Sequence, residues 1–109
     1  MNVVIRSGDD AKPRASYVVK SLKESDNGVV LESKNGHAFQ KLIAIAELVK
    51  QQLSKDRTSY HQYNTVRRKP SSDTIQMLIR FSLTPLSDLD STWTHQTNES
   101  DATMNDANS

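Results

Sequence analysis

The chain has 109 residues, with 14 Lys and Arg, 13 Asp and Glu, no cysteine and a formal net charge of +1. This length fits one domain with a short tail, and the lack of cysteine excludes disulfides and thiolate metal sites. We expect neither a signal peptide nor a membrane span, because no stretch is long and apolar enough.

The small net charge conceals two oppositely charged parts of the chain. Residues 1–86 hold all 14 basic residues and eight acidic ones, which gives a net charge of +6. Residues 87–109 hold five acidic residues and no basic one. A basic domain followed by an acidic segment predicts an anionic partner, and a tail that stays off the folded body or competes weakly for the same face.

The first part of the chain predicts a strand followed by a helix. Asn2 to Arg6 is a short β-branched run, and the polar residues 7–10 interrupt it. Pro13 suits the first turn of a helix, where its missing N–H costs nothing. Apolar residues then recur at helical spacing at Ala15, Val18, Val19 and Leu22. Residues 26–28 (Asp-Asn-Gly) predict the turn that ends this helix.

The stretch from Gly28 to Leu53 predicts a strand, a tight turn and a second helix. A β-branched run at 29–31 precedes the polar turn at 33–36. The helical pattern that follows has a wide apolar arc formed by Ala38, Phe39, Leu42, Ile43, Ile45, Ala46, Val49 and Leu53. This arc is wider than packing on one sheet needs, so it predicts either a well-buried core helix or a second surface for a partner.

Two strands and a tail are predicted after the second helix. Residues 58–66 are polar but rich in Thr, Tyr and Val, and residues 74–83 alternate between apolar and polar. The segment 67–73 between them predicts a hairpin loop, because Pro70 stops a ladder. We expect residues 1–88 to form the domain and residues 89–109 an acidic, mostly disordered tail. Two alternatives remain for Trp93 in that tail: either it has no structural role, or it docks on the domain or on a partner.

Three basic segments are the candidate nucleic-acid-binding sites. They comprise Lys12 and Arg14 in the first loop, Lys34, Asn35, Gly36 and Lys41 around the central turn, and Arg67, Arg68 and Lys69 at the hairpin tip. Lys and Arg neutralise phosphates, and a helix N-terminus directs N–H groups toward an anion. The first two loops should leave the sheet at the same end, whereas the pattern leaves the side of the hairpin open. Tyr60 and Tyr63 could stack on unpaired bases if they face outward.

The sequence gives no reason to expect an enzyme. His37, His61 and His95 fall in a predicted turn, a strand and the tail, without metal-ligand spacing. Nucleophile motifs, phosphate-cradling Gly-rich loops and paired carboxylates on one element are also lacking. We therefore expect no catalytic residue, metal, cofactor or small-molecule substrate.

Several segments together resemble the Alba family of nucleic-acid-binding proteins. Residues 36–41 (Gly-His-Ala-x-x-Lys) and 46–50 (Ala-Glu-Leu-Val-Lys) are similar to its signature. Residues 12–18 (Lys-Pro-x-x-x-Tyr-Val) resemble its basic loop before the first helix. His61-Gln62 is similar to a pair in eukaryotic members, and residues 81–83 (Phe-Ser-Leu) also fit. The resemblance covers residues 2–88, with slack at the boundaries.

This resemblance implies an α+β, Alba-like two-layer sandwich in the order strand-helix-strand-helix-strand-strand, with a four-stranded mixed sheet and two helices on one face. In the family the three basic loops form one nucleic-acid-binding face. His61-Gln62 and the acidic tail look like the eukaryotic Alba-type subunits of ribonuclease P and ribonuclease MRP. Those nuclear subunits, which also occur in the nucleolus, pair with a second Alba-type protein beside other ribonucleoprotein subunits. They clamp structured RNA in tRNA and rRNA processing.

Three departures from the family pattern leave alternatives open. Asn35 and His37 stand where the family often has arginines, the hairpin is short, and Asp9 and Asp10 enter the first loop. These changes weaken the case for general coating of duplex DNA and are compatible with structured RNA in a larger complex. The alternatives are an Alba homodimer that binds DNA, chromatin or RNA generally, and a basic module that binds an acidic protein.

Overall fold

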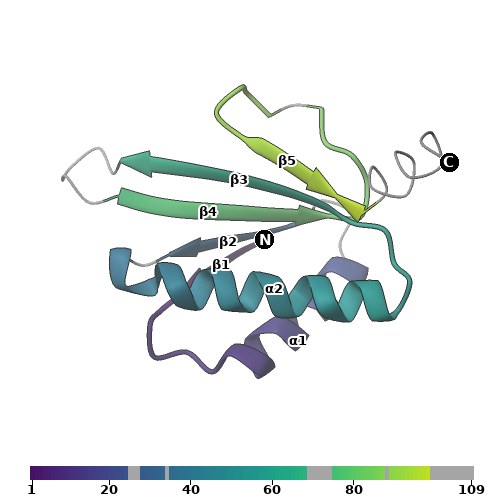
Figure 1. The fold of residues 1–109 in the computed structure, drawn as a ribbon, viewed down its shortest axis with the longest axis horizontal. Coiled ribbons are helices and arrows are strands. Elements are labelled where there is room, and N and C mark those ends of the chain that lie inside the picture. The colour runs from purple at the N-terminus through teal and green to yellow at the C-terminus, as the bar shows by residue number, and fades with distance from the viewer. Residues whose placement is uncertain (25–27, 34, 69–74, 88, 99–109) are drawn as a thin grey trace, which may run out of the picture.

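A computed structural model of the protein describes residues 1–24, 28–33, 35–68, 75–87 and 89–98 (Figure 1). The elements in chain order are β1 (Asn2–Ile5), α1 (Ala11–Glu24), β2 (Val29–Ser33), the short 3-10 helix η1 (Gly36–Ala38), α2 (Phe39–Lys55), β3 (His61–Arg68), β4 (Ile75–Ser82) and β5 (Thr94–Thr97). The predicted order therefore holds through β4. The third strand begins and ends later than predicted, so that it includes Arg67 and Arg68.

The five strands form one mixed sheet in the order β1-β2-β4-β3-β5. β1 pairs with β2 in parallel, and the other three pairs are antiparallel. Both helices lie on the same side of this sheet (Figure 1). The α+β class, the mixed sheet and the two helices on one face are thus confirmed, whereas the prediction of four strands is wrong by one.

The additional strand, β5, lies in the segment that the composition predicted to be mostly disordered. It pairs with the first half of β3, from His61 opposite Thr97 to Asn64 opposite Thr94. Asn98 extends the attachment, because its Oδ1 accepts from the backbone N–H of Tyr60 at 2.9 Å. The disorder prediction is therefore wrong for residues 94–97, while residues 99–109 lie outside the described part of the chain.

The hydrophobic core fills the space between the helices and the sheet. Its largest fully buried apolar side chains are Phe81, Ile5, Leu22, Leu31, Leu42, Ile45, Leu53, Val18, Val29 and Val49. The predicted apolar face of α1 is buried as expected. On α2 the predicted apolar arc is wider than the surface that the core buries, because Ile43 remains 46% exposed. The second helix therefore serves as a core helix and also leaves apolar surface uncovered.

Gly28 fixes how the chain enters β2. Its φ of 80° lies in the left-handed region, and a Cβ atom there would stand 2.4 Å from the carbonyl oxygen of Phe81. Only glycine accepts both conditions without strain. The close approach holds the start of β2 against the end of β4.

Candidate nucleic-acid interface

The strand register brings the three basic segments to one end of the domain. Ile5 pairs with Ser33 where the parallel strands β1 and β2 end, so the loops that follow them leave the sheet together. β4 runs against β2, and Arg68 pairs with Ile75 beyond the end of β2. The end of β3 and the start of β4 therefore lie at the same end, toward which the arrowheads of β2 and β3 point (Figure 1). The expectation for the first two loops is confirmed, and the register shows at which end of the sheet β3 ends and β4 begins.

The first basic segment belongs to a helix rather than to a loop. Lys12 and Arg14 lie in the first turn of α1, with Pro13 between them as predicted for a helix start. Arg14 Nε lies 3.6 Å from Asp9 Oδ2, and the same oxygen accepts from the backbone N–H of Arg6 at 2.9 Å. Asp9 thus orders this loop and offsets part of its positive charge.

Arg6 was not among the predicted site residues, although it lies beside them. Arg6, Arg14 and Tyr17 border a shallow polar concavity of about 280 Å³ on the β1–α1 side. The signal that could have identified Arg6 is a basic residue placed directly after a strand, at the end where the other loops leave. The end of the domain at which the three basic segments lie is called the basic end below. The concavity extends this end toward α1.

The central turn forms the short helix η1, which leads into α2. Asn35 caps η1, since its Oδ1 accepts from the backbone N–H of His37 at 3.0 Å. A Cβ added at Gly36 would meet no atom within 4 Å, so the backbone here faces open space. Lys41 is in the first turn of α2, and Lys34 lies outside the described residues. The arrangement leaves room for a phosphate beside Gly36, while Asn35 already has a structural role.

The third segment lies at the end of a strand and not in the hairpin loop. Arg67 and Arg68 are the last residues of β3, and Lys69 lies outside the described ranges. Consecutive strand residues point to opposite faces of a sheet. Val66 lines a groove beside α2, so Arg68 shares the helix-covered face and Arg67 the opposite one. The two exposed arginines therefore reach different surfaces.

The two tyrosines considered for base stacking are largely covered. Tyr63 is 5% exposed, stacks on His95 with ring centroids 4.6 Å apart, and accepts from the N–H of Leu86 through its hydroxyl. Tyr60 packs edge-on against Phe81. The condition for stacking on bases is therefore not met by Tyr63, which is buried, whereas Tyr60 is half-buried.

The acidic segment reaches the basic end through Asp90. The pKa of this carboxyl lies below its ordinary value, first because the Thr92 hydroxyl and backbone N–H donate to it. Nearby Arg67 acts in the same direction. Arg67 also places its guanidinium 5.5 Å from the centre of the Trp93 ring. The segment that precedes β5 therefore lies against Arg67 and does not stay off the folded body.

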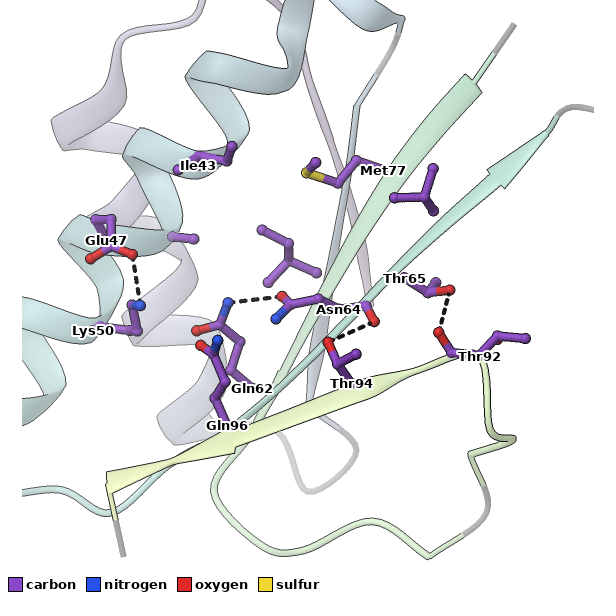
Figure 2. Close-up of a pocket in the computed structure, with 13 residues that line it drawn as sticks. Ile43, Glu47, Lys50, Gln62, Asn64, Thr65, Met77, Thr92, Thr94 and Gln96 are labelled. Carbon is purple, nitrogen blue, oxygen red and sulfur yellow. Dashed lines mark hydrogen bonds and ion pairs between the residues drawn. The ribbon is translucent and has the colours of Figure 1, made fainter. Parts of the chain in front are cut away.

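A groove of about 590 Å³ separates α2 from the β3-β4-β5 part of the sheet (Figure 2). Its walls combine the apolar Ile43, Val66 and Met77 with a row of amide and hydroxyl groups from β3 and β5. Gln62 Nε2 donates to Asn64 Oδ1 at 2.8 Å. Gln62 Oε1 is buried, and no described residue donates a hydrogen bond to it. The groove was missed by sequence reasoning, although polar Gln62 and Asn64 alternating along one strand were a signal.

The described ranges offer neither a metal site nor a membrane-spanning helix. They contain no group of three or more His, Cys, Asp or Glu that could hold a metal ion. None of the helices there is long and apolar enough to cross a membrane. The basic end and the groove are the candidate sites considered first.

Comparison of the chain with protein-family models gives no match, and comparison with curated proteins finds no relative. The function is therefore inferred from the geometry of the basic end and of the groove.

Proposed function

We propose that the protein is a non-catalytic, Alba-type RNA-binding protein that grips structured RNA with the basic end of its domain. The observation that carries this proposal is the convergence of three basic segments at one end of the sheet. Lysines and arginines gathered at one end of a domain bind phosphates and release counterions, which gives affinity without sequence choice. The resemblance to the Alba family supports the same assignment.

The charge at this end favours a polyanion. The described basic residues there are Arg6, Lys12, Arg14, Lys41, Arg67 and Arg68, and the acidic ones nearby are Asp9, Asp10, Glu32 and Asp90. Lys12 and Lys41 lie in the first turns of the two helices, where exposed N–H groups also favour anions. The modest excess of positive charge fits a protein that shares its RNA with neighbouring subunits.

The groove beside α2 supports the second part of the proposal, a heterodimer with another Alba-type protein. Ile43 is 46% and Val66 57% exposed, although both are apolar. Burying such surface in a partner removes it from water, and a donor from the partner would satisfy Gln62 Oε1. In this proposal the dimer is a nuclear or nucleolar subunit of ribonuclease P or ribonuclease MRP, together with other ribonucleoprotein subunits.

The experiment that tests the cellular role is recovery of the tagged protein from its own cells, with sequencing of bound RNA and identification of bound proteins. One abundant structured RNA with a second small Alba-like protein would support the proposal. Bulk DNA or mixed messenger RNA, with the chain paired to itself, would contradict it and favour a homodimer that binds DNA or RNA generally. Acidic proteins without RNA at modest salt would favour the protein-binding alternative.

A further inference from the structure

The sheet carries aromatic rings on the face opposite the helices, at its β5 edge. β5 is the outermost strand beside β3 in the described sheet (Figure 1). Tyr63 and Arg67 share one face of β3 because they are four residues apart. His95 stacks on Tyr63, and Trp93 lies under the guanidinium of Arg67. Trp93 and His95 therefore present their rings on this same outer face, two residues apart.

The rings differ in how far they are buried. His61 and Tyr63 are only 3% and 5% exposed. The segment between β4 and β5 is held on this face by two hydrogen bonds, from the N–H of Leu86 to the Tyr63 hydroxyl and from Thr65 Oγ1 to the Thr92 carbonyl at 3.0 Å. His95 remains exposed and Trp93 half-buried. Tyr63 and Arg67 thus hold two rings that are at least partly open to solvent.

We infer that Trp93 and His95, held by Arg67 and Tyr63, form a stacking platform for unpaired bases of single-stranded RNA. This inference rests on the proposed RNA-binding function and adds a second contact site to it. Aromatic faces bind bases of any sequence, and an arginine beside them contributes a cation–π contact. Bases in a duplex are already stacked and paired, so the platform selects unpaired nucleotides that flank a stem.

The charges around the platform determine how it should respond to salt. Arg67 favours a nearby phosphate, while the ionised Asp90 beside it disfavours one. Because these opposite charges offset each other, affinity at the platform comes from stacking and not from released counterions. Binding at the basic end through Lys12 and Lys41 should weaken steeply with salt, whereas the contribution of Trp93 should change little.

The test uses Trp93 as its own probe, because it is the only tryptophan in the chain. The full chain is titrated with a single-stranded oligouridine of about eight nucleotides and with a blunt RNA duplex of similar length. Oligouridine should quench the tryptophan fluorescence, and the duplex should not. Anisotropy of labelled RNA then gives the affinities of the variants at low and at moderate salt.

Trp93→Leu should weaken binding of oligouridine about tenfold and leave duplex affinity within about twofold. The ratio between the wild-type and variant affinities should be the same at both salt concentrations. Trp93→Phe keeps an aromatic ring and should restore most of the affinity, which separates stacking from a loss of folding. Thr94→Ala is the matched control, because Thr94 is exposed on the same strand but lines the groove on the opposite face.

Absence of quenching, or unchanged affinity of Trp93→Leu for oligouridine, would overturn the inference. Tighter binding by Trp93→Leu would overturn it too and would show that Trp93 keeps Arg67 away from RNA. If the inference is overturned in this way while duplex binding still depends on Lys12 and Lys41, the proposed function stands without the platform. Failure to bind either RNA would contradict both the inference and the proposed function.

Discussion

The Nδ1 atom of His61 lies 3.0 Å from the Nε2 atom of His95, and this contact joins β3 to the unexpected strand β5. The ring centroids are 5.2 Å apart and the planes differ by 17°. With the two nitrogens so close, this separation places the rings edge to edge, as in a hydrogen-bonded imidazole pair, and not face to face. Tyr63 then covers one face of His95.

We expect the attachment of β5 to depend on the histidine pair. One ring donates and the other accepts, so a side chain without ring nitrogens at position 95 removes the hydrogen bond between His61 and His95. His95→Phe keeps an aromatic ring that can stack on Tyr63, so its effect reports the loss of the hydrogen bond and not the loss of stacking.

The measurement is amide hydrogen exchange of Gln96 and Thr97 in wild type and His95→Phe at the same pH. Protection of both amides should fall several-fold in His95→Phe, because the loss of one hydrogen bond costs on the order of 1 kcal/mol. Equal protection in wild type and His95→Phe would contradict the role of the histidine pair.

Gly28→Ala should destabilise the domain, because alanine would adopt a strained positive φ and meet the Phe81 carbonyl oxygen. The free energy of unfolding should fall by about 1–3 kcal/mol, measured by urea denaturation. Gly36→Ala is the matched control, since a Cβ there meets no atom within 4 Å. Its unfolding free energy should change by less than about 0.5 kcal/mol. Equal effects of the two substitutions would contradict this account of Gly28.

Gly36→Ala also tests how RNA approaches the central turn. If the backbone contacts a phosphate there, the added methyl group should weaken RNA binding several-fold while the fold remains intact. Binding is measured by anisotropy with a labelled RNA stem. The control is Gly8→Ala, which likewise meets no atom within 4 Å but lies in the first loop. Unchanged affinity of Gly36→Ala would show that no phosphate comes close to this turn.

The helices and the first four strands were predictable because each carries a local sequence signal: an apolar period in the helices and in β4, and β-branched or aromatic residues in β1, β2 and β3. Leu42, Ile45 and Val49 recur on one face of α2, and apolar residues occupy every second position of β4 from Ile75 to Phe81. β5 was not predictable in this way, because residues 94–97 (Thr-His-Gln-Thr) have no aliphatic residue and join the sheet through backbone pairing and the His95 ring. Its stabilising contacts connect residues more than 30 positions apart in the sequence.

The candidate site was predictable in composition but not in geometry. The basic residues were evident, whereas the end of the sheet at which the hairpin lies depends on the β2–β4 register. The alternation of β3 sends Arg67 and Arg68 to opposite faces, because the strand continues past the predicted start of the loop. Trp93, for which the sequence left open whether it docks on the domain, contacts Arg67. Such long-range contacts leave no local pattern in the sequence.

Ile43→Asp should prevent association with the proposed second Alba-type protein and leave the fold intact. Ile43 is 46% exposed and borders the groove, so a carboxylate there costs little in the free chain but is unfavourable in an apolar interface. Light scattering after co-expression measures the association, and circular dichroism the fold. Tyr17→Asp is the control, since Tyr17 is 47% exposed on α1, away from the groove. Undiminished association of Ile43→Asp would place the interface elsewhere.

The central claim, that the basic end binds RNA, is tested most directly by the salt dependence of binding to an RNA stem. Wild type, Lys12→Ala/Lys41→Ala and the control Lys20→Ala/Lys55→Ala are titrated with the same labelled stem over a range of salt concentrations. The two double variants lose equal charge, but only the first loses it at the basic end. We predict that the slope of log affinity against log salt decreases by about 2 for Lys12→Ala/Lys41→Ala and little for the control. Equal slopes for the two double variants would show that the RNA senses only the overall charge and would contradict a binding site at the basic end.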